Sequence, residues 1–473
     1  MKAILFAPEL YYLGFCLLLF LVSLGRSAAA AARNLALAGS VLGVGAVAAC
    51  LSFEGSLFFD AYRVDLFSQG FKLAVAIGLA AVIIFGRGLK GVRPEVHAEF
   101  YMFMVLSALG LMMLVSSVEL LTIFIALEVS SYSLYVLVPM RDDRPGLHAQ
   151  MEAGVKYILF GAVATGVMLF GMSYIFGITG TTYLAGIMPK LGSLMGQPVA
   201  VVGMGMLLCG FFFKLAVFPF QFWVPDVYQG ASNETAAYCA TAPKLGAVAL
   251  LIRLVTLAGP DARALTEMLM ILSVASMFYG NLIALVQKDI KRMLGFSSVA
   301  HAGYVLIGIL TLREAGYGAA IYYIAGYLIM NLACFLVICQ VSRDGENVAI
   351  EDLEGLHQRS PILALTLAVG MFALAGIPPF VGFMGKFMLL YNALQEGYLW
   401  LVVCAAINTA ISIYYYLSVV RVSYTKDAND RPAVAVDGLT RVLSYGLMAL
   451  IVVMGLLPQR LVDMAATAMK GML

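Results

Sequence analysis

Four ionisable side chains stand near the middle of long apolar segments: Glu128, Lys214, Lys244 and Lys386. A charge at the centre of a membrane helix costs about 2.5 to 3.5 kcal/mol on insertion scales, so such residues require a partner or a function. Desolvation makes it easier for a buried carboxylate to take up a proton and for a buried ammonium to release one. Neighbouring groups of these two kinds can be loaded and discharged in turn, which is the chemistry of a proton relay.

Two of these lysines lie beside predicted helix breaks. Pro219 follows Lys214 by five residues and removes a backbone donor inside an apolar run. Gly376, Pro378 and Pro379 interrupt a second run, just before the last of the four ionisable residues. Interrupted helices beside ionisable side chains are typical of transport sites, because irregular backbone is tolerated at membrane depth only within protein or along a wet cavity.

Other ionisable residues in these segments are open to more than one interpretation. His301 is either a satisfied core histidine or a central relay group, since imidazole titrates near neutral pH. Lys156, near the start of its helix, either snorkels or takes part in the relay. For Lys72 and Arg253, which lie near helix ends, snorkelling toward an interface is expected.

The elements that must position these residues are membrane helices. The chain has 473 residues, of which 62% are hydrophobic and only 12% charged, so an integral membrane protein is expected. The runs are continuous rather than alternating, which favours an all-α polytopic fold over strands.

The first thirty residues resemble a signal peptide, but Glu9 interrupts their core and more helices follow, so a membrane helix is expected. About fourteen segments of membrane-spanning length occur near 4–24, 34–53, 66–86, 97–117, 119–139, 152–177, 198–222, 235–258, 264–286, 295–312, 316–341, 361–395, 399–420 and 440–458.

The connections predict an orientation. Alternate connections carry roughly 16 Lys and Arg residues, Arg26 and Arg144 among them, against about 7 for the other set together with both termini. Both termini are therefore expected on the periplasmic side of a bacterial inner membrane. The charged loop segments 141–145 and 351–355 are expected to be solvated, and 287–295 is expected on the cytoplasmic side, its charge reflecting the positive-inside bias. The tail after Pro458 is expected to form a short amphipathic end.

Cofactor chemistry finds no support in the sequence. The seven cysteines all fall within apolar segments without a C-x-x-C pair, so a metal site, an iron–sulfur cluster or a disulfide framework is not expected. A formal net charge of +2 with no basic cluster gives no indication of nucleic-acid binding.

The spacing of the ionisable residues predicts an internal duplication. Glu128 precedes Lys214 by 86 residues and His301 precedes Lys386 by 85, with a helix break beside each lysine. Halves of five helices each would be inverted relative to one another. The expected parts are 1–96 with helices 1–3, 97–258 with the first repeat, 264–422 with the second, and 440–473 with helix 14 and the tail.

Four stretches resemble the proton-conducting antiporter-like subunits of respiratory complex I, the NADH-quinone oxidoreductase. They are Phe213 to Ala231, Ala242-Pro243-Lys244, Gln287 to Ser298 and Gly376 to Phe387. The resemblance extends over nearly the whole chain, and the Gly-Ile-Pro-Pro element, the Glu-Val-Ser-Ser-Tyr after Glu128 and the length favour the subunit N branch of this family.

The resemblance implies roles for the residues found above. Glu128 would be the helix 5 carboxylate, paired most plausibly with Lys156, and Lys214 would be the lysine of broken helix 7. Lys244 would lie on the central axis, His301 would bridge two half-channels, and Lys386 would belong to broken helix 12. Lys72 receives no role from the resemblance.

The implied partners are other membrane-arm subunits, including homologous antiporter-like subunits, and the lipid bilayer. They would hold the NADH, flavin, iron–sulfur clusters and quinone, and this chain would bind no cofactor and have no complete active site. Two alternatives remain: a subunit of a sodium/proton antiporter or membrane-bound hydrogenase, which use the same fold, and a non-conducting structural subunit whose buried charges only hold helices together.

Overall fold

The computed structural model describes every residue except 1, 26–27, 143–148, 426, 428–430 and 473. Arg26 and Arg144, which entered the orientation argument, lie outside the described residues, as do 143–145 of the first charged loop. The helices are α1 Ala7–Ser23, α2 Ala28–Ala49, α3 Leu66–Phe85, α4 His97–Ser116, α5 Leu120–Leu137, α6 Ala149–Thr179, α7 Leu184–Leu194, α8 Pro198–Leu215, α9 Trp223–Gly230, α10 Asn233–Val255, α11 Arg263–Ala284, α12 Ile290–Ile309, α13 Glu314–Val341, α14 Leu356–Arg359, α15 Pro361–Ala375, α16 Val381–Gln395, α17 Leu399–Thr425, α18 Gly438–Leu456 and α19 Gln459–Met472.

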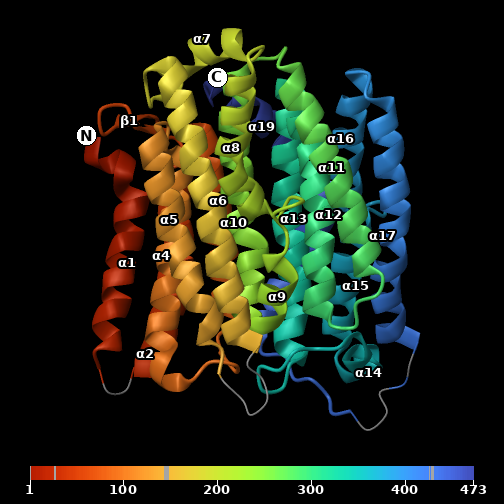
Figure 1. The fold of residues 1–473 in the computed structure, drawn as a ribbon. Coiled ribbons are helices and arrows are strands. Elements are labelled where there is room, and N and C mark those ends of the chain that lie inside the picture. Colours follow the sequence, from red (N-terminus) through yellow and green to blue (C-terminus); the bar gives the residue numbers. More distant parts are fainter. Residues whose placement is uncertain (1, 26–27, 143–148, 426, 428–430, 473) are drawn as a thin grey trace.

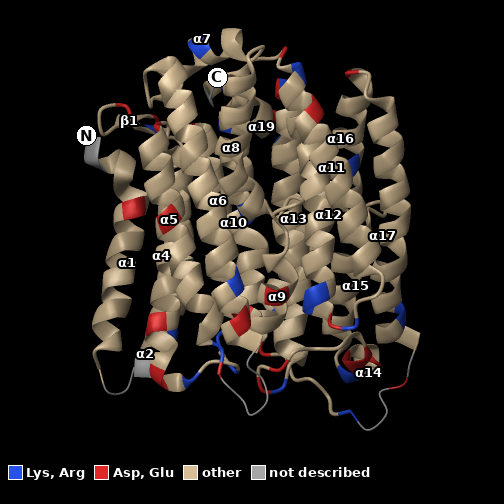
Figure 2. Ribbon diagram, in the orientation of Figure 1, with Lys and Arg blue, Asp and Glu red and all other residues tan. Residues whose placement is uncertain are grey.

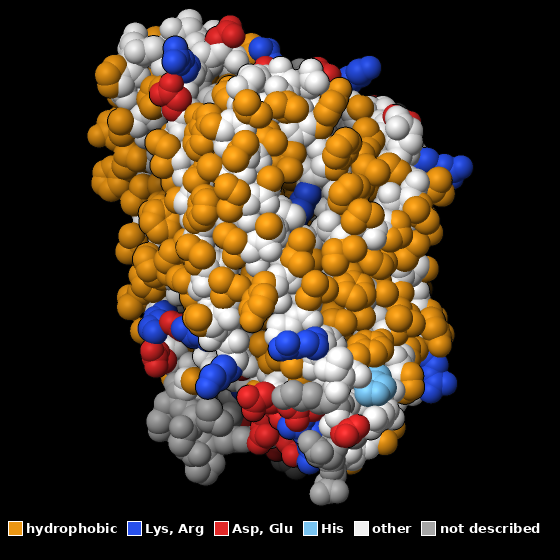
Figure 3. Space-filling model, turned by 90° about the vertical axis from the view of Figure 1, so that its right-hand side faces the viewer, with side chains coloured by type: hydrophobic (Ala, Val, Ile, Leu, Met, Phe, Trp, Pro, Cys, Tyr) orange, Lys and Arg blue, Asp and Glu red, His pale blue; other side chains and the backbone are white. Residues whose placement is uncertain are grey.

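These helices confirm the all-α polytopic fold. In the described part of the chain, twelve helices are long and apolar enough to cross a membrane. The two remaining predicted segments correspond to α12 and to the interrupted pair α15 and α16. The long helices run side by side along one common direction (Figure 1). Charged residues gather mainly at the two ends of this bundle (Figure 2), and hydrophobic side chains cover the middle of its side face (Figure 3).

The helix that carries Lys244 lies at the centre of the bundle. Every residue of α10 is buried, and α3, α4, α8 and α13 pack around it. Ser232 caps its first turn by accepting a hydrogen bond from the backbone N–H of Thr235.

The chain termini lie at the same end of the bundle (Figure 1). The assignment of that end to the periplasm stays a prediction.

Both predicted helix breaks are present. The first separates α8 from α9 over residues 216–222, and the second separates α15 from α16 over 376–380. Each upstream helix ends in a residue with left-handed backbone, Ala216 (φ 68°) and Gly376 (φ 87°), and a proline follows three residues later. The left-handed residue ends the helical hydrogen-bond ladder and proline cannot resume it at once.

Short elements at the ends of the bundle were not predicted. Strands β1 (Gly55–Leu57) and β2 (Tyr62–Val64) form an antiparallel hairpin between α2 and α3, with Ser56 opposite Arg63. The hairpin lies in a connection outside the apolar runs, so the expected all-α membrane fold holds. The predicted amphipathic tail is α19, which buries Ala465, Ala468 and Met469 and exposes polar residues.

Candidate functional site

Lys214 and Glu128 form the first buried centre. Lys214, in the last turn of α8, is 2% exposed, and its Nζ donates a hydrogen bond of 2.8 Å to Ser131 Oγ. Glu128 lies one helical turn before Ser131 on the same face of α5 and accepts a 2.9 Å hydrogen bond from Thr165 Oγ1. The predicted cluster of hydroxyls after Glu128 thus supplies the direct partner of the lysine. A carboxylate and an ammonium share one buried surface of α5.

The expected pairing of Glu128 with Lys156 is not what the structure shows. Lys156 Nζ instead contacts Asp226 Oδ2 at 2.7 Å and Glu152 Oε1 at 2.6 Å, and its side chain is 37% exposed. Glu128 bonds to Thr165, which lies nine residues farther along α6, or roughly 13 Å along the helix axis. The two groups therefore stand at different depths.

Asp226 is a functional candidate that sequence reasoning did not single out. Its Oδ1 lies 2.8 Å from Arg292 Nη1, and its Oδ2 lies 2.7 Å from Lys156 Nζ. The carboxylate of α9 therefore ties α6 to α12. A signal for it existed, since it follows the Pro219 break within the same motif.

Two neighbouring basic residues also differ from expectation. Lys291 was expected in a cytoplasmic connection, but it lies in α12, is 0% exposed and donates a 3.0 Å hydrogen bond to the carbonyl oxygen of Ala231. Arg141 donates to the carbonyl oxygens of Gln229 (2.8 Å) and Gly345 (2.9 Å). Carbonyl groups at the C-terminal end of α9, those of Gln229 and Ala231, attract both side chains. By contrast, Glu351 and Asp352 are exposed, as expected.

Lys244 is a buried ammonium without an aligned partner. It is 1% exposed, and its Nζ has no hydrogen-bond acceptor among the described residues. The Nζ atom lies 5.6 Å from the centroid of the Tyr327 ring. A buried cation with so little compensation requires bound water or the loss of its proton.

His301 connects this lysine to the second half of the molecule. Its Nδ1 lies 2.6 Å from Tyr323 Oη and its Nε2 lies 2.9 Å from Tyr416 Oη. The Tyr327 ring, already in contact with Lys244, has its centroid 5.2 Å from that of the imidazole. Both ring nitrogens are therefore engaged by hydroxyls that can exchange a proton. The tyrosines were missed because a tyrosine in an apolar segment gives the same sequence signal as any core aromatic residue.

Lys386 closes the row on the other side of His301. Its Nζ lies 4.8 Å from the centroid of Tyr304, whose ring centroid is 6.3 Å from that of His301. The same Nζ donates to the carbonyl oxygens of Leu374 (3.2 Å) and Ala375 (3.1 Å) at the end of α15. Lys244, His301 and Lys386 are thus joined through two tyrosine rings into one buried row.

The two remaining basic candidates do not snorkel. Lys72 is 0% exposed and its Nζ lies 2.7 Å from Glu9 Oε1. Arg253 is 4% exposed and its Nη2 contacts both carboxylate oxygens of Asp65, at 3.0 and 2.9 Å. The snorkelling prediction failed because a buried acidic partner, which a single segment cannot reveal, holds each cation inside.

Comparisons with known proteins identify similar chains. A transmembrane family described as NADH:quinone oxidoreductase/Mrp antiporter matches residues 117–412. The chain is 51% identical over 459 residues to NADH-quinone oxidoreductase subunit N 2 of Opitutus terrae, covering 97% of this chain and 96% of the relative.

Solved structures agree. A chain of respiratory complex I from Thermus thermophilus with bound aureothin is 32% identical, with a TM-score of 0.84 and coverage of 97% of this chain and 99% of that chain. A chain of the Mrp complex from Dietzia sp. has a TM-score of 0.85 at 21% identity, covering 99% of this chain and 97% of that chain. At that identity the second likeness shows the fold alone.

Proposed function

The chain belongs to the NADH:quinone oxidoreductase/Mrp antiporter transmembrane family, and on this premise we propose that it is the subunit N of a proton-translocating NADH:quinone oxidoreductase. It is a membrane-arm subunit of complex I, and the other membrane-arm subunits are its partners. Its site in the cell is the bacterial inner membrane, with both termini on the periplasmic side.

The relay consists of Glu128, Lys214, Lys244, His301 and Lys386. The observation that carries this assignment is the buried row in which Tyr327 lies against both Lys244 and His301, and Tyr304 against both His301 and Lys386. At the other end, Lys214 and Glu128 share the face of α5 that carries Ser131. Hydroxyls and internal water between these groups carry the proton from one to the next.

Lys156 acts at the edge of this relay rather than inside it. Its contacts with Asp226 and Glu152 and its partial exposure support a role in proton entry from the end of the bundle opposite the termini. Asp226 extends the contact to Arg292, so a charge change at this edge reaches both halves of the chain.

The energy for transport comes from outside this chain. Moving one charge against roughly 150 to 200 mV costs about 3.5 to 4.6 kcal/mol. We infer that quinone reduction in partner subunits supplies it, and that the link is electrostatic: a charge change near Glu128 alters the proton affinity of Lys214, and that change passes along the row. This chain contributes groups that bind, hold and release protons, and the redox chemistry belongs to the partners.

We further infer that 97–258 and 264–422 are two inverted repeats. Features of the first break recur 160 residues later in the second. Ala216 corresponds to Gly376, and a proline follows each of them by three residues. In both breaks a phenylalanine carbonyl oxygen accepts hydrogen bonds that close the helix end. Close packing at Gly110 against Ser130 recurs 170 residues later, at Gly280 against Ala300.

The test is proton transport by the intact complex in sealed vesicles. We expect Lys214→Ala and Lys244→Ala to assemble, oxidise NADH and move fewer protons per NADH. Lys190→Ala is the matched control, because within the described residues Lys190 donates only to the carbonyl oxygen of Thr179, at an end of the bundle. Wild-type proton stoichiometry in both relay variants would refute the assignment, and a parallel loss of assembly and transport would favour a structural role.

A further inference from the structure

A buried ion pair lies outside the relay, between two of the three N-terminal helices. Glu9 on α1 and Lys72 on α3 are both 0% exposed, and Lys72 Nζ lies 2.7 Å from Glu9 Oε1. Tyr62 in β2 donates a 2.7 Å hydrogen bond to the same oxygen. A buried pair of this kind is costly to desolvate, so we expect it to have a function.

Several polar atoms around this pair are buried and unsatisfied. Within the described residues, Glu9 Oε2, Gln69 Oε1 and Ser116 Oγ have no hydrogen-bond partner, and the contact of Lys72 Nζ is an ion pair without hydrogen-bond alignment. Ser116 precedes Ser117, which forms a bridge with Tyr62, and Gln69 lies one turn before Lys72 on α3. Buried polar groups without protein partners are the places where internal water binds.

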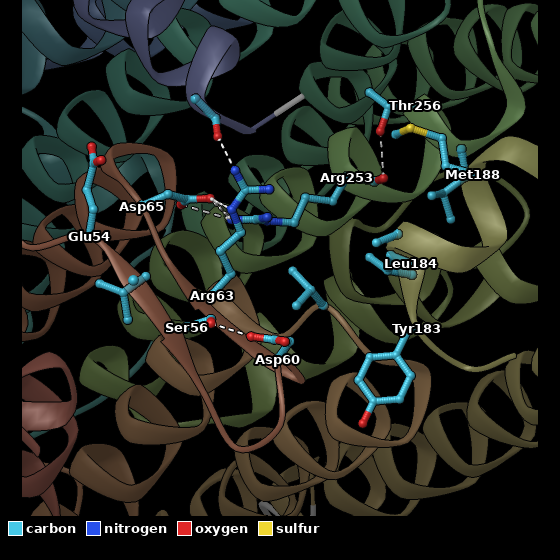
Figure 4. Close-up of a pocket in the computed structure, with 16 residues that line it drawn as sticks. Glu54, Ser56, Asp60, Arg63, Asp65, Tyr183, Leu184, Met188, Arg253 and Thr256 are labelled. Atoms are coloured by element: carbon cyan, nitrogen blue, oxygen red, sulfur yellow. Dashed lines mark hydrogen bonds and ion pairs between the residues drawn. The ribbon is translucent and has the colours of Figure 1, made fainter. Parts of the chain in front are cut away.

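This polar region adjoins a cavity at the end of the bundle that carries the termini. The cavity has a volume of about 820 Å³ and is lined by Arg63, Asp65 and Arg253 (Figure 4). Side chains alternate in β2, so Tyr62 is buried beside Glu9 while Arg63 is exposed on the cavity side. Asp65 begins α3, and Lys72 lies two turns along the same helix, roughly 10 Å away. A single strand and the first turns of α3 separate the pair from the cavity.

We propose that Glu9 is a further proton-binding site of the transport reaction, one that exchanges protons with water in this cavity by way of Tyr62. On loading, an O–H bond forms at Glu9 Oε1 as the O–H bond of Tyr62 breaks, and the Tyr62 oxygen takes a replacement proton from hydronium in the cavity water, which becomes water, while Lys72 keeps its positive charge. On discharge, that bond breaks, the proton returns to water and the ion pair is restored. The Asp65–Arg253 pair connects the start of α3, beside this cavity, to α10, the helix that carries Lys244. This inference rests on the proposed function.

The experiment uses the intact complex in vesicles and the double variant Glu9→Gln/Lys72→Met. It removes both charges together and keeps side chains of similar size, so no buried charge is left unpaired. We expect assembly and NADH oxidation to persist, with about a twofold or greater loss of protons moved per NADH. Lys72→Arg keeps the ion pair and should retain transport. Wild-type stoichiometry in the assembled double variant would overturn the proposal.

A second pair of variants keeps the test decisive if the double variant fails to assemble. Tyr62→Phe removes only the hydroxyl that bonds Glu9 and should slow transport. Tyr12→Phe is its matched control, because Tyr12 is equally buried and its hydroxyl has no partner among the described residues. Equal transport in these two variants would also overturn the proposal. Lys214→Ala, measured in parallel, reports separately on the relay itself.

Discussion

The two helix breaks solve the same structural problem with different chemistry. In the first, the indole Nε1 of Trp223 donates a 2.9 Å hydrogen bond to the carbonyl oxygen of Phe213. In the second, the ammonium of Lys386 donates to the carbonyl oxygens of Leu374 and Ala375. The first break is capped by a neutral group that never changes charge, which leaves Lys214 free to bond Ser131. In the second, Lys386 is both the cap and a member of the proposed relay.

The lysines also stand on opposite sides of their breaks. Lys214 belongs to the helix before the break, and Lys386 to the helix after it. With the 160-residue offset of the breaks, the counterpart of Lys386 is Asp226, and the counterpart of Lys214 is Leu374. The similar spacings of 86 and 85 residues suggested that the two lysines are equivalent, and the break geometry corrects this. The halves share a backbone design and distribute their charges differently.

The largest expected effect separates the two breaks by their packing. A Cβ atom at Gly382 would collide with the carbonyl oxygen of Ala373, whereas the corresponding Phe222 is half exposed. Gly382→Val should therefore destabilise the protein by about 3 kcal/mol or more, and Phe222→Ala should change stability by less than about 0.5 kcal/mol. Thermal dissociation of the purified complex measures both. Similar melting of the two variants would show that the second break is no more tightly closed than the first.

A smaller effect tests whether cap and relay are separate in one break and joined in the other. Trp223→Phe removes one of two hydrogen bonds to the Phe213 carbonyl oxygen, which keeps the 3.1 Å bond from the backbone N–H of Ala216, so it should lower stability by about 0.5–1.5 kcal/mol. Lys386→Met removes the side-chain donor from two buried carbonyl oxygens, so it should lower stability by about 1–3 kcal/mol. Only Lys386→Met should also reduce protons moved per NADH. Reduced stoichiometry in Trp223→Phe would show that the first cap is not independent of the relay.

Hydropathy and proline placement were enough to predict the helices, both breaks and the ionisable residues of the row. Partners were harder to predict. The sequence around Lys72 resembles a helix end, and only the three-dimensional structure reveals that Glu9 on α1 lies 2.7 Å from its Nζ and neutralises it. Lys156 and Glu128 are suitable partners by charge. Yet Glu128, on α5, lies beside Thr165 of α6, about two and a half turns farther along that helix than Lys156. Depth and partner depend on how helices pack, and the pattern within one segment does not contain that information.

The smallest effect concerns the residue at which each upstream helix ends. Gly376→Ala should cost about 1–2 kcal/mol, because an L-residue pays this for left-handed backbone. Its Cβ would also lie 3.0 Å from Lys386 Cδ and crowd the cap. Ala216 already pays the backbone cost, so Ala216→Gly relieves it. That gain is nearly cancelled by about 0.4–1 kcal/mol of added chain entropy in the unfolded state. Thermal dissociation should therefore fall for Gly376→Ala and stay nearly constant for Ala216→Gly. Equal and opposite shifts would mean that backbone conformation alone distinguishes the two breaks, and that the lysine in the second contributes nothing to its closure.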